Sequence, residues 1–233
     1  MDRTSPILYE LSGRDDRRFS PFCWKTRMAL AHKGFFPEGI PVGFTEKSLI
    51  AFSGQERVPI LIDQGTIVTE SWTIACHLED SYPDRPTLFG GSMGRNLAGF
   101  IDAWATRSVF PLLVRLVLCD VVDHLEGADA DYVRTSREKQ MGLTFAAMRQ
   151  ERDRWLDPFR QSLAPARSHL KRQLFISGEA PGYADYCLFG FFQWARMISS
   201  YPVIESSDTV GVWRSRVLEL FDGFASKAPA SSN

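Results

Sequence analysis

A serine at the start of a predicted helix is the first feature of this chain that can do chemistry. In Ser20-Pro21-Phe22-Cys23, the proline suits the first helical turn, where its missing N–H costs nothing. Ser20 then lies at the N-cap, beside unpaired backbone N–H groups at the positive end of the helix. A hydroxyl and several N–H groups at one point can hold an anionic group. The same pattern is common as a plain helix cap, and these residues alone favour that simpler interpretation.

Two further stretches have similar potential. Val58-Pro59 directly precedes the apolar run 60–62, and a cis bond there would turn the N–H and C=O of Val58 towards a ligand. Only about 5% of X–Pro bonds in folded proteins are cis, so the local sequence does not justify one. Glu70-Ser71 follows a predicted strand and opens a predicted helix. Ser71 is therefore either a ligand-binding hydroxyl or another N-cap.

The elements that position these residues follow from the apolar pattern and the turn signals. Residues 12–18 are polar, and we expect a flexible loop over the mouth of a pocket. Gly34 suits the end of the first helix, and residues 47–57 are expected to be irregular. The predicted elements are a strand at 6–11, a helix at 20–33, a short strand within 36–46, a hairpin of 60–62 and 66–69 around residues 63–65, and a helix from 71 to about 82.

Proline and glycine residues then interrupt the pattern, and strand signals fade after residue 94. Pro111 should kink or restart the helix that begins near 94, and the tail from 225 to 233 is expected to fray. Further helices are predicted at 129–156, 158–173, 183–200 and 210–224. The sequence therefore predicts an α/β domain over residues 1–82, a linker over 83–92 and an all-helical domain over 93–233.

Composition narrows the function classes. The 233 residues are 44% hydrophobic, which is enough for a real core, and the net charge is −1. No electrostatic attraction to nucleic acid or to an anionic membrane is expected. We find no apolar signal segment and no apolar run of membrane-spanning length, so a cytoplasmic protein is expected. The four cysteines and four histidines are scattered without metal-ligand spacing, which predicts no metal site and buried, reduced thiols at Cys76, Cys119 and Cys187.

Taken together, the three stretches resemble the cytosolic glutathione transferase family, and the resemblance covers nearly the whole chain. It implies a thioredoxin-like N-terminal domain and a helical C-terminal domain, with glutathione as co-substrate. It assigns catalysis to Ser20 and glutathione binding to Val58, Pro59, Glu70 and Ser71. It also implies a homodimer. Asp185 matches the buried aspartate near the start of the family's core helix, although Gly182 replaces the usual Ser or Thr cap.

Several motifs look like those of bacterial β-etherases, which cleave lignin-derived aryl ethers, and of related fungal etherase-type transferases. These motifs are residues 20–27 (SPFCWKTR), 31–34 (AHKG), 56–59 (ERVP), 82–86 (YPDRP) and 184–186 (ADY). They are specific for the superfamily and only suggestive of the etherase reaction, because several belong to the scaffold. In that reaction the glutathione thiolate attacks the ether-bearing carbon and a phenolate leaves.

An aromatic electrophile should lie between the two domains. The candidates for that wall are Phe19, Trp24, Trp104, Arg107 and Tyr132, although aromatic residues at helical spacing are more often core. Two other functions stay open. The first is a glutathione-dependent thiol–disulfide reductase, which Ser20 disfavours because the attacking sulfur is missing. The second is a non-catalytic carrier of apolar ligands.

Overall fold

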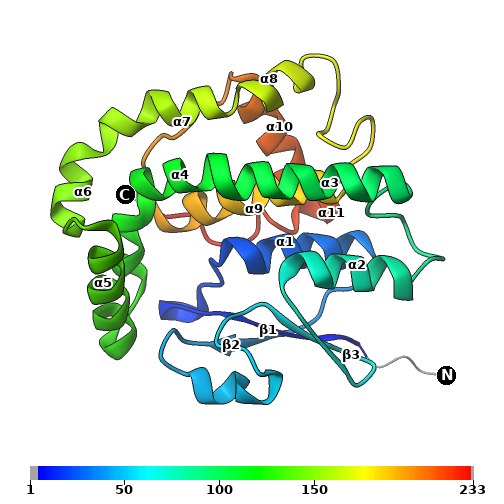
Figure 1. The fold of residues 1–233 in the computed structure, drawn as a ribbon, viewed down its shortest axis with the longest axis horizontal. Coiled ribbons are helices and arrows are strands. Elements are labelled where there is room, and N and C mark those ends of the chain that lie inside the picture. Colours follow the sequence, from blue (N-terminus) through cyan, green and yellow to red (C-terminus); the bar gives the residue numbers. More distant parts are fainter. Residues whose placement is uncertain (1–4, 232–233) are drawn as a thin grey trace.

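The computed structural model describes residues 5–231, and it places an α/β domain beneath a helical one (Figure 1). The first domain has the predicted order of elements. They are β1 (Ile7–Leu11), α1 (Pro21–His32), β2 (Gly39–Val42), β3 (Ile60–Asp63), β4 (Thr66–Thr69) and α2 (Ser71–Ser81).

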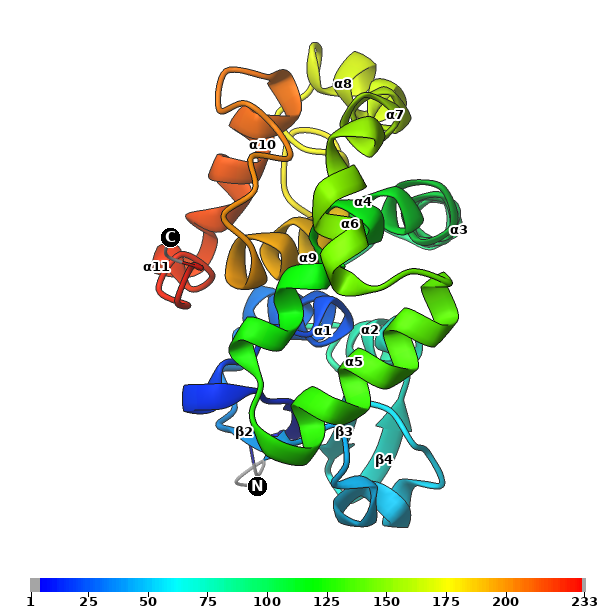
Figure 2. The same ribbon diagram turned by 90° about the vertical axis from the view of Figure 1, so that its left-hand side faces the viewer.

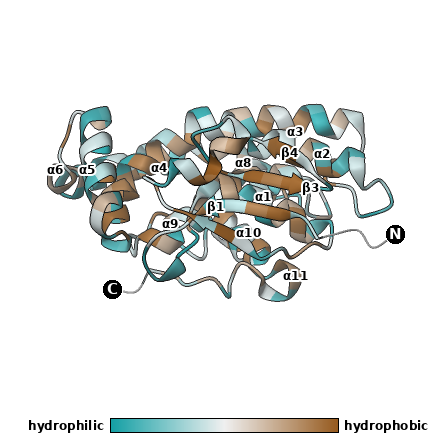
Figure 3. Cartoon of the chain, turned by 90° about the horizontal axis from the view of Figure 1, so that it is seen from below, coloured by the Kyte–Doolittle hydropathy of each residue, from teal (hydrophilic) through white to brown (hydrophobic). Residues whose placement is uncertain are grey.

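The four strands form one mixed sheet in the order β2-β1-β3-β4. β1 is parallel to β2 and antiparallel to β3, and β3 is antiparallel to β4. Side chains alternate between the two faces of a strand, so Leu8 and Leu61 join the main core with α1 and α2, while Val42, Ile50 and Ile60 form a small cluster apart from it. The strands of the sheet are predominantly apolar (Figure 3). This is the thioredoxin-like arrangement that the sequence predicts.

The predicted hairpin is confirmed. β3 and β4 pair from Ile60–Thr69 to Asp63–Thr66, and the two residues between them have positive φ angles, 50° at Gln64 and 81° at Gly65. Two consecutive positive φ angles define the type I′ turn that suits a two-residue hairpin, and glycine adopts such a φ without steric cost.

The second domain is entirely helical among the described residues apart from an isolated bridge. Its core helix α9 is buried along almost its whole length. Pro111 lies in the first turn of α4, so the helix restarts there as predicted, directly after a π-helical turn over Ala105–Val109. The helices are α3 (Ser92–Trp104), α4 (Phe110–Val117), α5 (Gly127–Met141), α6 (Phe145–Glu151), α7 (Leu156–Ser162), α8 (Ala164–Leu170), α9 (Tyr183–Ile198), α10 (Thr209–Leu218) and α11 (Leu220–Gly223).

Asp185 ties the start of α9 to the loop before it and to α10. Its buried carboxylate accepts hydrogen bonds from the backbone N–H groups of Ile176, Ser177 and Gly182 and from the indole N–H of Trp213, at 2.7 to 3.2 Å. Gly182 has no side chain, so only its backbone carbonyl accepts a hydrogen bond from the Asp185 N–H, at 3.0 Å. The expected loss of the side-chain cap is therefore real, and Asp185 serves the fold rather than the chemistry.

The two domains are packed through α1 and α9 (Figure 2). A side chain at Gly190 would meet the carbonyl oxygen of Pro21 at 2.4 Å, so only glycine permits this close approach. Next to it, the Lys25 ammonium, 1% exposed, lies 2.7 Å from the Asp102 carboxylate on α3. The start of α1, where Ser20 lies, is thus held against the helical domain.

Two segments are more ordered than their sequences predict. Residues Lys47–Ser53 form a 3-10 helix instead of an irregular stretch. The loop of residues 12–18 contains a 3-10 turn, Arg14–Asp16, and hydrogen bonds hold it on both sides. Arg18 pairs with the buried Glu10 at 3.0 Å, and Arg17 donates to the carbonyl of Met197 at 2.9 Å.

The chain end is also packed rather than frayed over the part that the structure describes. Arg196 donates to the carbonyls of Ser226 and Ala228, and Arg17 donates to those of Pro229 and Ala230. The prediction of a frayed tail is therefore wrong for residues 225–231, and residues 232 and 233 lie outside the described range. Arg17 could not be assigned this role from the sequence because its partners are about 200 residues away.

Candidate functional site

The register of the sheet brings the three candidate stretches to one end of the first domain. Tyr9 pairs with Ile60, and Ile60 pairs with Thr69. β1 therefore ends where β3 begins and where β4 ends. Residues 58–59 precede β3, residues 70–71 follow β4, and the chain leaving β1 leads to Ser20.

Ser20 forms the predicted N-cap of α1. Its side chain is 5% exposed, and its Oγ accepts a hydrogen bond from the N–H of Cys23 at 3.3 Å. The Trp24 N–H bonds to the Ser20 carbonyl at 3.0 Å, and Pro21 has no N–H. The N–H of Phe22 is what remains at this helix start, together with the Ser20 hydroxyl proton. Ser20 therefore is a helix cap, and because its Oγ acts there only as an acceptor, the hydroxyl proton can still be donated to another partner.

That donor faces one protein competitor, the thiol of Cys23. Burial, reinforced by the charge of Glu10, raises the pKa of Cys23 to about 12, against a hydrogen bond from Ser20 that lowers it. The group is therefore a neutral thiol at physiological pH. A neutral thiol is a weak hydrogen-bond acceptor, so an incoming thiolate would outcompete it for the Ser20 hydroxyl.

The peptide bond between Val58 and Pro59 is cis, the conformation that the sequence alone did not justify. Pro59 is buried and Val58 is half-buried at the start of β3. Ligand binding by the backbone of Val58 stays a prediction.

The start of α2 differs from the predicted cap. Glu70 is the N-cap residue, with an exposed side chain that makes no capping bond, and Ser71 is the first helical residue. The plain-cap alternative for Ser71 is therefore wrong. Glu70 has φ 68°, and a non-glycine residue held there costs about 1–3 kcal/mol, a strain that clusters at ligand sites. The Ser71 carbonyl accepts the Tyr183 hydroxyl at 2.8 Å, which fixes this helix start against α9.

Two of the five residues expected to contact the electrophile are buried in the core. Phe19 is 1% exposed, with its ring centroid 6.3 Å from that of Phe44. Trp24 is 2% exposed, and its indole N–H donates to the Arg18 carbonyl at 2.7 Å while its ring packs beside Phe224. Trp24 thus anchors the chain end to α1.

A third, Trp104, lines a cavity of about 640 Å³ between α3, α8 and residues 176–182, together with Leu97 and Phe100. Arg107 and Tyr132 are exposed. The structure therefore does not bring the five residues into one wall. Sequence reasoning missed Phe110, which is half-buried and packs edge-on against Phe22 with centroids 5.9 Å apart. Helical spacing placed Phe110 among many apolar residues and could not single it out.

Helix α5 reaches from the second domain to the loop after β2 (Figure 2). The Asp129 carboxylate accepts hydrogen bonds from the N–H groups of Phe44 and Thr45, both at 2.8 Å, and from the Thr45 hydroxyl at 2.6 Å. Tyr132, also on α5, acts electrostatically on Lys47 of the first domain. α5 therefore bounds the same side of the molecule as the candidate site. Within residues 5–231, no group of three His, Cys, Asp or Glu side chains is placed to hold a metal ion, and no helix is long and apolar enough to cross a membrane.

Comparison with known families decides the classification. Residues 19–81 match the glutathione S-transferase N-terminal domain, and residues 97–224 match the glutathione S-transferase C-terminal domain. The chain belongs to the glutathione S-transferase family. The first matched segment contains α1 to α2 and leaves out β1, and the second begins within α3.

Individual relatives are distant. A glutathione S-transferase-like protein, ustS of Aspergillus flavus, is 26% identical over 140 residues, which cover 54% of this chain and 49% of that protein. The match thus spans about half the length of this curated relative. The glutathione S-transferase CsGST63524 of Ceriporiopsis subvermispora, solved in complex with glutathione, has a TM-score of 0.85 at 20% identity and covers 98% and 100% of the two chains. GSTFuA2 of Phanerochaete chrysosporium has a TM-score of 0.80 at 21% identity, with the same coverage. These structures confirm the predicted fold.

Proposed function

We propose that this transferase binds glutathione at the shared end of β1, β3 and β4 and activates its thiol with Ser20. The observation that carries the proposal is the convergence of Ser20, the Val58–Pro59 segment and the strained Glu70 at that end. Each feature alone could have a purely structural role, but the three together match the pattern of the family to which the chain belongs. The experiment that tests it is calorimetric titration of the full chain with glutathione, and absence of binding at millimolar concentration would contradict it.

Thiol activation needs a modest free energy. A free thiol like that of cysteine has a pKa of about 8.5, and lowering it by about two units requires roughly 2.7 kcal/mol. A hydrogen bond from a hydroxyl to a charged group contributes roughly 1.5–3 kcal/mol. The positive end of α1, where the Phe22 N–H remains, adds up to roughly 1 kcal/mol. The hydroxyl and the helix end are therefore sufficient without a general base.

The other end of glutathione suits the start of α2. In this proposal the exposed Glu70 carboxylate pairs with the α-amino group of the γ-glutamyl residue. The Ser71 hydroxyl and the N–H groups at the start of α2 bind its carboxylate. The backbone of Val58, beside Pro59, would hold the cysteinyl part between these two points. These roles place the glutathione sulfur at Ser20.

We propose an apolar aromatic compound as the electrophile, with the side chains of Phe22 and Phe110 beside Ser20 and with Arg107 and Tyr132 at the exposed rim. β-Aryl ether cleavage is the specific reaction that the motif resemblance suggests. In it the C–S bond forms as the C–O bond breaks, and the electron pair leaves with a phenolate. A panel of model β-aryl ethers of both configurations tests this step, and a generic chlorinated nitroaromatic tests transferase activity in general.

A reductase would need reactive thiols at positions 20 and 23, but residue 20 is a serine and Cys23 is too buried to react. Cys23 is 1% exposed with a pKa of about 12, and a neutral buried thiol is a poor nucleophile in disulfide exchange. Turnover of the chlorinated nitroaromatic with glutathione above the uncatalysed rate would exclude the carrier alternative.

The homodimer and the cytoplasmic location are proposals by family membership. Helix α3 exposes Met93, Leu97 and Phe100 at 77%, 61% and 70%, and a continuous exposed apolar stripe of this kind favours an interface with a second copy.

A further inference from the structure

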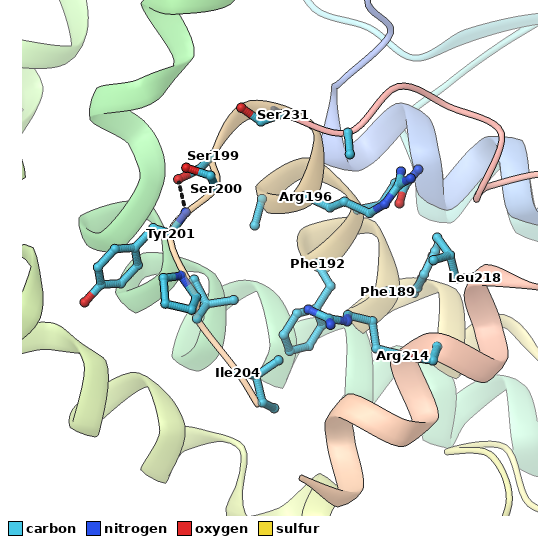
Figure 4. A pocket seen from close by; sticks show the side chains of 16 residues that line it. Phe189, Phe192, Arg196, Ser199, Ser200, Tyr201, Ile204, Arg214, Leu218 and Ser231 are labelled. Carbon is cyan, nitrogen blue, oxygen red and sulfur yellow. Dashed lines mark hydrogen bonds between the residues drawn. The ribbon is translucent and has the colours of Figure 1, made fainter. Parts of the chain in front are cut away.

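A second cavity, of about 350 Å³, lies on the helical domain (Figure 4). It is bounded by the C-terminal half of α9, by residues 199–204, by α10 and by Ala230 and Ser231 of the chain end. None of Ser20, Val58, Glu70 and Ser71 lines it, so it is separate from the glutathione site proposed above.

A guanidinium group without a counter-charge lies in this cavity. Arg214, half-buried on α10, forms no hydrogen bond or ion pair with any residue between 5 and 231. Burial and the charge of the neighbouring Arg196 both lower its pKa. Arg196 already donates to the carbonyls of Ser226 and Ala228, and Glu219 acts on Arg196 only at longer range. Two cations therefore face one distant carboxylate, and Arg214 retains its planar fork of donors, which fits a carboxylate.

Gln193, a residue of the cavity lining, carries a buried acceptor without a partner among the described residues. Gln193 is 1% exposed, and its Nε2 donates to the carbonyl of Ala225 at 2.9 Å. Exchanging the amide's oxygen and nitrogen would set two carbonyl oxygens against each other, so this bond determines which atom is the oxygen. The remaining atom, Oε1, accepts no hydrogen bond from any described residue. Buried acceptors almost always have a partner, so this atom calls for a donor.

The rest of the lining is mixed: Arg196 and the serines Ser199, Ser200, Ser215 and Ser231 contribute polar groups, and apolar and aromatic side chains form one wall. The side chains of Phe189, Phe192, Ile204 and Leu218 surround the space between α9 and α10 (Figure 4). A ligand therefore needs an apolar body of one or two rings between a negative charge and a donor.

We propose that this cavity binds a small aromatic carboxylate that also carries a hydroxyl group. The carboxylate pairs with the Arg214 guanidinium, the hydroxyl donates to the Gln193 Oε1, and the ring packs against Phe192. The site is distinct from the thiol-activating site and does not depend on it.

The test is calorimetric titration of the full chain with 6-hydroxy-2-naphthoate, with saturating S-hexylglutathione present to occupy the other site. We expect one saturable site per chain. Because a charge-assisted bond to the ligand is lost, Arg214→Met should weaken binding about 10- to 100-fold. The matched control is Arg172→Met, which removes the same charge from an exposed residue outside the cavity and should leave affinity unchanged. 2-Naphthoate, without the donor, should bind several-fold more weakly than the hydroxylated probe.

A second variant, Ser200→Trp, tests the cavity even if Arg214→Met does not fold. Ser200 is an exposed residue of the lining, and Ser200→Trp should fill the cavity and abolish binding without disturbing the core. Binding that survives both Arg214→Met and Ser200→Trp would overturn the proposal, as would no binding at millimolar probe. All variants should retain wild-type glutathione affinity, so failure here is distinguishable from failure of the proposed function.

Discussion

Replacing the Ser20 hydroxyl tests whether a helix cap also activates a thiol. Ser20→Ala removes the acceptor for the Cys23 N–H, 3.3 Å away, which costs about 0.5–2 kcal/mol of folding free energy as at other N-caps. The proposed mechanism adds a second loss of roughly 1.5–3 kcal/mol, because the thiolate loses its hydroxyl donor. That loss raises the pKa of bound glutathione by about 1.1–2.2 units.

The pH dependence of the rate separates these two effects. If bound glutathione has a pKa of about 6.5 in the wild type, the variant's thiolate fraction is about 7- to 80-fold lower than the wild-type fraction at pH 6.5. At pH 9 the two fractions differ by no more than about 1.5-fold. We therefore expect kcat/KM with a chlorinated nitroaromatic to fall by that factor at pH 6.5 and to recover at pH 9. Ser20→Thr should retain most activity because it keeps the hydroxyl.

A second N-cap in the same chain supplies the control. Thr144 caps α6 by accepting a hydrogen bond from the Ala147 N–H at 3.2 Å. Thr144→Ala should lower stability as Ser20→Ala does and leave the pH–rate profile unchanged. If Ser20→Ala keeps full activity at pH 6.5, or loses the same factor at every pH, Ser20 is only a cap and the mechanism is wrong.

Four further predictions follow from the same geometry. Ser20→Cys should lose transferase activity and gain reduction of the mixed disulfide of glutathione with hydroxyethyl thiol, because a cysteine at a helix start is a low-pKa thiolate that forms a disulfide with glutathione; no gain of reductase activity would count against it. Ser71→Ala should weaken glutathione binding by roughly 1–3 kcal/mol in calorimetry, since the γ-glutamyl carboxylate loses its hydroxyl, and an unchanged affinity would remove Ser71 from the site. Sedimentation at micromolar concentration should show a dimer, which Phe100→Glu on the exposed face of α3 should convert to monomer; a monomeric wild type would refute this. Burial and the charge of Lys33 lower the pKa of His32 in the folded chain, where its Nδ1 lies 2.7 Å from the Tyr186 hydroxyl. The same histidine has a pKa of about 6.5 when unfolded, so below that pH the unfolded chain binds more protons than the folded one. Stability to urea should therefore rise with pH up to about 6.5 and then level off, and a His32→Gln variant with the wild-type slope would contradict this.

Local signals in the sequence predicted most of the fold. The hairpin turn at residues 63–65, the proline after Ser20 and the breaks between Pro83 and Gly91 each act through the backbone of a few neighbouring residues. Their consequences could therefore be read without knowing the tertiary structure. In the structure α2 ends at Ser81 and α3 begins at Ser92.

Features that depend on distant partners could not be predicted. Helical spacing shows that Trp24 and Trp104 share stripes with other apolar residues. It does not show that Trp24 packs on Phe224 or that Trp104 lines a cavity beside α8. The same limit applies to Arg214 and Gln193, because they line one cavity only when α9, α10 and the chain end pack together.

We expect the chain to bind glutathione and to lower the pKa of its thiol. Ultraviolet difference titration of the wild-type complex measures this directly, because the thiolate absorbs where the thiol does not. We predict a pKa of about 6.5 for the bound thiol, about two units below that of a free cysteine-like thiol. A pKa that stays near about 8.5 on saturation with glutathione would contradict the account.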